Sequence, residues 1–289
     1  MITNVDMSKY SSMKTGGVAE VCCFPESTDE LCSVIKELKD KGKRYFVLGN
    51  MSNVLIPDEN IDFVPVITTK MNGVTVSENN DGSVSVYAQC GVMLTKLAFD
   101  MCKKGYAGMV FAYGIPGTVG GAVFMNAGAY GSEISAVCEY VDYFDVENDK
   151  VCRVDAEKCA FGYRKSIFDE NEYVILGASL KLAKGNADEL VAEAKATMQK
   201  RIDKQPLEYP SCGSAFKRPE GYFAGALIEQ SGLKGFSVGG AQISEKHAGF
   251  VINKGGATTK DVTDLMEAVS KKVKENFGVE LEPEIRTLK

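Results

Sequence analysis

Residues 114–131 read GIPGTVGGAVFMNAGAYG, and six of these residues are glycine. Because glycine has no Cβ, backbone N–H groups in such a segment can approach an anion closely and form a nest for phosphate oxygens. Thr118 and Asn126 add side chains that can hydrogen-bond a ligand. A tight structural crossover would produce the same pattern, so glycine content alone leaves both interpretations open.

A second donor-rich loop, residues 49–53 (GNMSN), lies between two apolar runs, 44–48 and 54–56, that are typical of strands. Loops at strand ends are where mixed folds place ligands, although a plain turn explains the loop equally well. Taken together, two loops rich in hydrogen-bond donors favour one extended ligand that carries a diphosphate.

Capping signals and hydrophobic spacing predict the other elements. Ser27 and Glu30 have capping-box spacing and begin a helix that Gly42 follows. Further helices are expected at 93–104, 186–202, 223–230 and from Thr258 or Thr259 onward, and further strands at 64–68, 73–77, 84–88, 137–146, 151–154, 173–181 and 279–288. Prolines and a local excess of basic residues in 200–219 predict a domain boundary near residue 200.

Composition excludes several classes of protein. The 289 residues are 45% hydrophobic and 25% charged, with a net charge of -6, which disfavours disorder and nucleic-acid binding. Residues 1–14 lack the apolar core of a signal peptide, and no apolar run is long enough to span a bilayer. Nine cysteines without C-x-x-C spacing are expected to be reduced thiols, and a single histidine, His247, leaves no two-histidine metal site. No metal is therefore expected, and no Walker A or G-x-G-x-x-G motif is present.

Three residues could carry chemistry. Arg164 lies between aromatic residues and could grip a carboxylate bidentately, although a surface arginine is the simpler interpretation. Ser214 follows Gly213 near two cations and fits a proton donor better than a nucleophile, because no histidine base accompanies it. Glu284 shares one face of the last predicted strand with Arg286.

Six collinear segments resemble the UDP-N-acetylenolpyruvoylglucosamine reductases, which are flavoenzymes also called UDP-N-acetylmuramate dehydrogenases. They are TGG at 15–17, the segment 114–131, YRKSIF at 163–168, QPLEYPS with GS at 205–214, GAQISEKHA at 240–248 and LEPEIR at 281–286. The chain resembles the shorter type of this family, without the extra tyrosine-bearing loop. Met51 stands where a glycine is usual, and Cys212 replaces a small residue beside Ser214.

The resemblance implies an α+β chain with an FAD-binding domain of the vanillyl-alcohol-oxidase (PCMH) type, in two subdomains of about 1–70 and 71–185. This domain would cover residues 1–200. A smaller α+β substrate-binding domain would cover 201–289, and its last strand would return Glu284 to the site. The residues that the resemblance implies for FAD are Gly49, Asn50, Ser52, Asn53, Gly114, Ile115, Pro116, Gly117, Thr118, Gly120, Gly121, Ala122, Asn126 and Gly128.

The reaction implied is reduction of the enolpyruvyl ether of UDP-N-acetylglucosamine to the lactyl ether, which gives UDP-N-acetylmuramate for peptidoglycan. NADPH would reduce FAD, and reduced FAD would deliver hydride from N5. Arg164 and a protonated Glu284 would stabilise the charge that develops on the substrate, and Ser214 would protonate the α-carbon. Substrate contacts are implied for Tyr163, Lys217, Arg218 and Gln242.

Two other functions compete with this one. The first is an FAD-dependent oxidase or dehydrogenase of the same fold that acts on a different small hydroxyl compound. The second is a flavin- or nucleotide-binding protein without turnover, which gives no role to Arg164, Ser214 and Glu284 together. For the reductase we expect a cytoplasmic monomer whose partner is a small UDP-sugar, with neither nucleic acid nor membrane as a partner.

Overall fold

The computed structural model describes all 289 residues, and the chain divides into two compact units. Unit 1 consists of Met1, Cys22–Asn50 and Phe63–Gln199, and unit 2 consists of Ile2–Val21, Met51–Asp62 and Lys200–Lys289. Each unit is therefore assembled from separated stretches of chain. The expected domain bounds, 1–200 and 201–289, stay a prediction.

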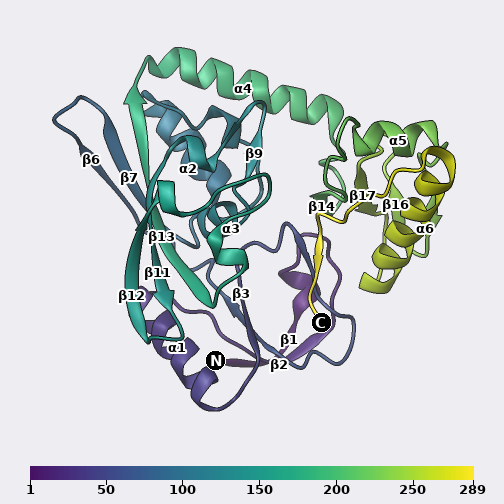
Figure 1. Cartoon of the computed structure of the whole chain (residues 1–289), viewed down its shortest axis with the longest axis horizontal. Coiled ribbons are helices and arrows are strands. Elements are labelled where there is room, and N and C mark those ends of the chain that lie inside the picture. Colours follow the sequence, from purple (N-terminus) through teal and green to yellow (C-terminus); the bar gives the residue numbers. More distant parts are fainter. The chain divides into compact units, whose positions relative to one another are not determined.

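An antiparallel sheet with the strand order β12-β11-β13-β7-β6 forms the largest element of unit 1 (Figure 1). Its strands are β6 (Val74–Glu78), β7 (Val84–Gln89), β11 (Cys138–Asp145), β12 (Lys150–Asp155) and β13 (Tyr173–Lys184), and the short β8 (Tyr106–Ala107) also pairs with β13. In β7, buried Val84, Val86 and Ala88 alternate with half-buried residues, as expected for a strand with one face in the core.

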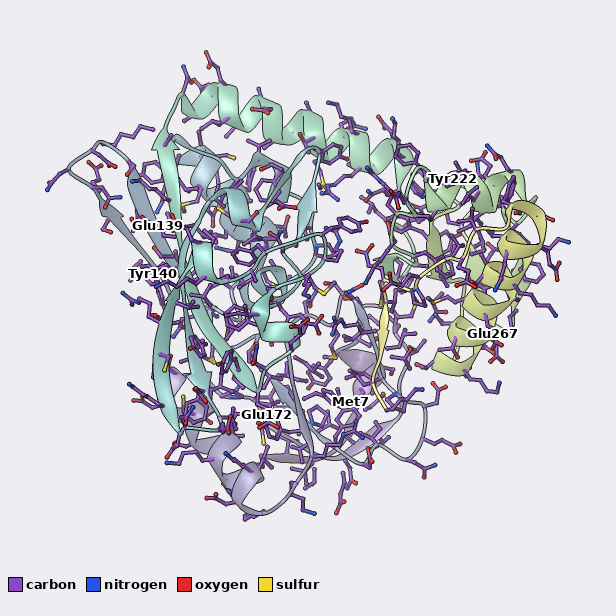
Figure 2. The ribbon with its side chains drawn as sticks, viewed as in Figure 1. Met7, Glu139, Tyr140, Glu172, Tyr222 and Glu267 are labelled. Carbon is purple, nitrogen blue, oxygen red and sulfur yellow. The ribbon has the colours of Figure 1, made fainter.

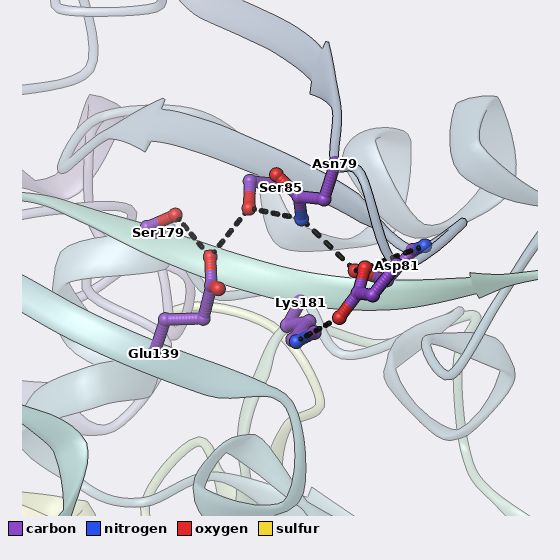
Figure 3. Close-up of polar contacts among 7 residues, drawn as sticks. Asn79, Asp81, Ser85, Glu139, Ser179 and Lys181 are labelled. Atoms are coloured by element: carbon purple, nitrogen blue, oxygen red, sulfur yellow. Dashed lines mark hydrogen bonds and ion pairs between the residues drawn. The ribbon is translucent and has the colours of Figure 1, made fainter.

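The other face of this sheet is polar. Glu139 on β11 accepts hydrogen bonds of 2.8 Å from both Ser85 on β7 and Ser179 on β13 (Figure 3). Lys181 on β13 pairs with Asp81 in the turn between β6 and β7. The two faces of the sheet therefore differ in the way that the alternating sequence predicts.

Unit 1 also contains two small strand pairs, one parallel and one antiparallel. Strand β3 (Tyr45–Leu48) runs parallel to β5 (Val64–Ile67), while β9 (Gly128–Ala129) and β10 (Ser132–Glu133) form a hairpin. The turn of this hairpin is Tyr130–Gly131, and both residues have positive φ, +53° and +85°. A two-residue turn with two positive φ angles matches the twist of the strands that it joins.

A four-stranded antiparallel sheet, ordered β14-β17-β16-β15, forms the centre of unit 2. Its strands are β14 (Ser211–Ser214), β15 (Ser237–Val238), β16 (Ala241–Ile243) and β17 (Phe250–Asn253). Helix α6 (Thr259–Phe277) packs on β15 and β16, and α5 (Ala224–Gln230) packs on α6. Unit 2 also contains the parallel pair of β4 (Val54–Leu55) and β18 (Arg286–Thr287), and the short strands β1 (Ile2–Asp6) and β2 (Val18–Cys22) pair with each other.

Apart from α3, which was not predicted, the helices begin close to where capping signals and hydrophobic spacing predict. They are α1 (Thr28–Asp40), α2 (Leu94–Lys103), α3 (Val119–Phe124), α4 (Ala187–Lys204), α5 (Ala224–Gln230) and α6 (Thr259–Phe277), with 3-10 turns at Met7–Lys9, Val110–Ala112, Ile134–Ala136, Ala156–Lys158 and Ile167–Asp169. Ser27 caps α1, and Thr258 caps α6 through a complete capping box with Asp261. Gly42 has a φ of +60°, the left-handed conformation expected after a helix end.

None of the helices combines the length with the apolar character that crossing a lipid bilayer requires.

The prediction of one continuous strand over 279–288 is wrong. Only Arg286–Thr287 pairs as a strand, with β4, while Pro283 bridges Phe216 before it. Residues 279–288 pair with two different parts of the chain, near Phe216 and with β4. Pro283 also has no N–H to donate to a neighbouring strand, so one continuous strand does not form. Leu281 and Ile285 are nevertheless buried, so the alternation that suggested the strand is present.

Candidate active site

The two glycine loops that the sequence singles out meet within unit 1. The amide of Asn50 donates to the carbonyl of Pro116 at 2.7 Å. A Cβ placed on Gly49 would lie 2.1 Å from Oγ1 of Thr118, so no larger residue fits there without displacing Thr118. Glycine at position 49 therefore allows the close approach of the two loops.

Most donors around the start of α3 are already used within the chain. The N–H of Val119 donates to Val92 and that of Gly120 to Cys90, both at 2.8 Å, and Thr118 Oγ1 accepts the more distant N–H of Gly121 at 3.5 Å. A Cβ on Gly120 would lie 2.9 Å from the Cβ of Cys90. Gly120 thus fits the close-packing explanation.

The backbone N–H groups that are left for a ligand lie directly before the first residue of α3. The N–H groups of Gly117 and Thr118 find no acceptor within the chain, and Pro116 beside them is exposed. On the N-terminal side, the N–H of Gly114 is held by Thr95 Oγ1 at 2.8 Å, which fixes the direction of the loop. No local signal in the sequence singles out Thr95, because its partner Gly114 lies 19 positions away. Within 114–122, fewer backbone N–H groups are therefore available to bind phosphate than the glycine pattern suggests.

Asn126 is fully buried, with a φ of +42°, and its side chain connects three parts of unit 1. Its amide donates to Glu133 Oε1 at 2.8 Å and to the carbonyl of Gly162 at 3.1 Å, and its Oδ1 accepts from the N–H of Ser135 at 2.9 Å. The side chain expected to contact FAD is thus committed to contacts within the chain.

Arg164 lies at the tip of a tight turn. Gly162 and Lys165 exchange two backbone hydrogen bonds of 3.0 and 3.2 Å, which leaves Tyr163 and Arg164 as the two turn residues. The φ of Arg164 is +56°, a left-handed conformation that costs a non-glycine residue about 1–2 kcal/mol. Its guanidinium lies 5.1 Å from the centre of the Tyr163 ring and 3.4 Å from the carbonyl of Gly128. Such strain concentrates at functional sites.

In unit 2, Ser214 is the last residue of β14 and is exposed. Gly213 before it has a φ of +74° and opens a bulge in the pairing with β17. The neighbouring Cys212 is 2% exposed, and burial raises the pKa of its thiol to about 12. The thiol points into the core of unit 2, at 3.5 Å from the carbonyl of Val54, rather than toward the turn.

Glu284 lies next to the Ser214 turn. Its N–H donates to the carbonyl of Ala215 at 2.8 Å, and its own carbonyl accepts from the amide of Asn53 at 3.0 Å. The side chain of Glu284 is half-buried. Two residues that are 70 positions apart in sequence, Ser214 and Glu284, are thus joined through one backbone hydrogen bond at Ala215.

The part of the 49–53 loop in unit 2 contains an unexpected conformation. Met51, where glycine is usual in the family, has a φ of +48° and is 4% exposed. The left-handed conformation that favours glycine is therefore retained by a methionine whose side chain contributes to the core. Ser52 and Asn53 follow it and are half-buried.

Two of the four residues expected to contact substrate, Lys217 and Arg218, line a cavity of about 360 Å³ in unit 2. Lys217 pairs with Glu282 at 2.5 Å, and the guanidinium of Arg218 lies 4.6 Å from the centre of the Phe223 ring. The cavity is lined by Lys217, Arg218, Pro219, Glu220, Tyr222, Val279, Glu280 and Glu282, with Tyr222 just ahead of α5 (Figure 2). Gln242 is not among these residues. Its amide donates to Gly235 and Ser237, while its buried Oε1 has no partner.

The side chain of His247 is committed to contacts within unit 2. Its Nδ1 accepts the N–H of Gly249 at 3.1 Å, and its ring packs edge-on against Phe250. Burial lowers the pKa of the imidazole. A neutral histidine with one nitrogen committed to the backbone fits a place in the core of unit 2.

The chain is similar to known proteins along nearly its whole length. A family model described as FAD binding domain matches residues 19–154, and one described as UDP-N-acetylenolpyruvoylglucosamine reductase, C-terminal domain, matches 205–288. The reductase of that name from Clostridium novyi is 47% identical over 98% of the chain and 90% of its own length. The one from Caldanaerobacter subterraneus is 44% identical over 98% and 92%.

A solved structure agrees with the sequence relatives. The crystal structure of UDP-N-acetylenolpyruvylglucosamine reductase from Thermus caldophilus has a TM-score of 0.81 and 31% identity, covering 99% of this chain and 98% of that one. The expected α+β class, with an FAD-binding domain of the vanillyl-alcohol-oxidase (PCMH) type, is confirmed.

Proposed function

Because the chain belongs to the UDP-N-acetylenolpyruvoylglucosamine reductase family, we propose that it reduces the enolpyruvyl ether of UDP-N-acetylglucosamine to UDP-N-acetylmuramate, a peptidoglycan precursor. It is an FAD-containing oxidoreductase that uses NADPH. The observation that carries this function is similarity to reductases of that name along nearly the whole chain, at both the sequence and the structural level. The oxidase of the same fold, weighed above as an alternative, is not favoured by these relatives.

The residues of unit 1 fit the pyrophosphate of FAD. Gly49 lies against Thr118 with no room for a Cβ, and the N–H groups of Gly117 and Thr118 lack acceptors. Backbone donors without internal partners are the groups that bind phosphate oxygens in such nests. When bound, FAD supplies the hydride that NADPH provides. We propose that the loops at 49–50 and 114–122 hold it.

Arg164 and Glu284 act on the carboxylate of the enolpyruvyl group. As the double bond is reduced, negative charge spreads from the α-carbon into this carboxylate, so donors aimed at it lower the barrier. Arg164 supplies a planar guanidinium on a strained turn, which keeps its position defined. Glu284, in its protonated form, donates a second hydrogen bond.

Ser214 protonates the α-carbon. Its hydroxyl lies at an exposed strand end, held by the bulge at Gly213 and by the hydrogen bond from the N–H of Ala215 to Gly249. Proton transfer from a positioned side chain typically contributes about 10²–10⁴-fold to rate. The contact between Ala215 and Glu284 supports a shared site for the two residues.

Substrate binding involves the anionic diphosphate of the UDP-sugar. Lys217 and Arg218 supply positive charge beside the 360 Å³ cavity, with Tyr163 next to Arg164 and Gln242 as further contacts. The pair between Lys217 and Glu282 must open, or share its lysine, when a diphosphate arrives. We infer that the enzyme works as a cytoplasmic monomer without nucleic-acid or membrane partners, which the acidic net charge of -6 supports.

The anaerobic visible spectrum of the purified protein tests this function. An oxidised-flavin spectrum should bleach with NADPH and return when the enolpyruvyl UDP-sugar is added. A protein that takes up no FAD would overturn the whole proposal. Bleaching without recovery would show that the protein is a flavoprotein but that this UDP-sugar is not its substrate.

A further inference from the structure

We propose that Asn53 is a positioning residue for Glu284, acting on the backbone that follows that glutamate. The resemblance implies an FAD contact for Asn53, and in the structure its side chain donates to the backbone of Glu284. This inference rests on the proposed function, because it assumes that Glu284 donates to the substrate carboxylate.

Asn53 holds the chain around Glu284 at two points. Its side-chain Nδ2 donates to the carbonyl of Glu284 at 3.0 Å, and its own carbonyl accepts the N–H of Arg286 at 3.0 Å. The two residues are separated by 231 positions in the sequence, so this is a tertiary contact rather than a local turn.

A third bond completes the restraint. The N–H of Glu284 donates to the carbonyl of Ala215 at 2.8 Å. The peptide groups on both sides of the Glu284 Cα are then fixed, one by Ala215 and the other by Asn53. Because the direction of the Cα–Cβ bond follows from the backbone at that residue, these bonds fix the starting point of the carboxyl side chain relative to Ser214.

The Asn53 amide adds to the restraint that a short strand pair places on this part of the chain. The strand pair that follows, β18 with β4, contains only Arg286 with Val54 and Thr287 with Leu55. A pair this short supplies few hydrogen bonds. Glu284 lies outside it, so the Asn53 side chain extends the restraint by two residues toward the catalytic position.

The test separates the two half-reactions of the FAD-loaded enzyme. Asn53→Asp keeps the size of the side chain but turns the donor into an acceptor that faces the Glu284 carbonyl. We expect the reoxidation of reduced flavin by the enolpyruvyl UDP-sugar to slow by roughly 10- to 100-fold, since small misplacements of catalytic groups have effects of this size. Flavin reduction by NADPH should change far less, and FAD content should stay near that of the parent. Equal slowing of both half-reactions, or loss of FAD with a normal second half-reaction after reloading, would overturn the proposal.

A double-mutant cycle distinguishes positioning from general damage. If Asn53 acts through Glu284, then Asn53→Asp should add little slowing in the background of Glu284→Ala, because the group that it positions is already removed. Slowing that multiplies in the double mutant would refute the inference. If Glu284→Ala alone leaves the second half-reaction unchanged, the role proposed for Glu284 fails, and that outcome is separate from a failure of Asn53.

Two further variants control the result. Asn50→Ala removes an amide from the same loop whose partner is Pro116, so it should weaken FAD retention without selectively slowing the second half-reaction. Asn53→Gln keeps a donor one methylene further out and should restore part of the rate lost in Asn53→Ala. If Gln and Ala are equally slow while Asp is like the parent, the hydrogen bond has no role. If Asn53→Asp does not fold, the comparison of Asn53→Gln with Asn53→Ala still tests whether the side-chain donor matters.

Discussion

Replacing Gly49 by alanine tests the contact between the two glycine loops. The new Cβ would lie 2.1 Å from Thr118 Oγ1 and 3.1 Å from two further atoms of that side chain. Gly49 does not have a positive φ, so the backbone accepts alanine and the clash is the only cost. Thr118 cannot move freely, because it is 1% exposed and its hydroxyl caps α3.

The magnitude follows from these two constraints. Loss of a threonine cap costs about 1 kcal/mol, and forcing an extra carbon into a packed site costs about 1–3 kcal/mol. We expect Gly49→Ala to lower the free energy of unfolding by about 2–4 kcal/mol. At about 2–4 °C for each kcal/mol in a chain of this size, Tm should fall by roughly 4–16 °C.

Thermal and urea unfolding of the FAD-free protein measure this loss without the contribution of cofactor binding. Thr118→Ala in the Gly49→Ala background should restore part of the stability, because it removes the atom that clashes. Gly121→Ala is the matched control in the same loop, since its Cβ would meet only Thr118 Oγ1 at 3.7 Å and alanine favours a helix. A Gly49→Ala protein within about 0.5 kcal/mol of the parent would refute the reasoning, because changes of that size are typical of surface positions without special contacts.

Four other outcomes are expected. Ser214→Ala should leave bleaching by NADPH intact and slow reoxidation by the enolpyruvyl UDP-sugar about 10²–10⁴-fold, and normal rates in both steps would exclude Ser214 as the proton donor. Arg164→Lys keeps the charge but loses the fork geometry, so turnover should fall while FAD stays bound; loss of FAD would assign Arg164 to the cofactor. Cys212 should resist thiol reagents in the native protein at pH 8 and react in urea, as mass spectrometry of labelled peptides can show, because burial raises its pKa to about 12. His247 has a lowered pKa in the folded state, so the unfolded chain binds more protons below about pH 6.5; unfolding free energy should fall as pH drops below that value, and His247→Gln should flatten this dependence.

Local signals in the sequence predicted local structure well. Ser27, Thr258 and Gly42 each act within a few residues of themselves, and each does what its type and spacing indicated. The helix α3 and the hairpin of β9 and β10 were not predicted, because the glycine-rich segment has low intrinsic preference for either. Contacts with Val92, Cys90 and Glu133 from elsewhere in the chain decide the structure there.

The residue types at the candidate site could be selected from the sequence, but their partners could not. Nothing local in the sequence indicates that Asn126 commits its whole amide within unit 1, or that Asn53 reaches the backbone of Glu284. Both bonds depend on how distant segments meet. The conformation of Met51 was hidden for the same reason, since a methionine gives no sign of a positive φ.

Unit 2 is assembled from segments that are far apart in the chain, and this affects the order in which the two units can fold during synthesis. Strand β4 at Val54–Leu55 must wait for β18 at Arg286–Thr287, which is synthesised much later. Unit 1 lies almost entirely within Cys22–Gln199 and can collapse while residues 200–289 are still being made. The segments Ile2–Val21 and Met51–Asp62 then remain exposed on the nascent chain until the C-terminal stretch emerges to cover them. Premature termination shortly before residue 286 would therefore leave early segments without their partners, which makes such fragments targets for chaperones and proteases rather than partly active enzymes.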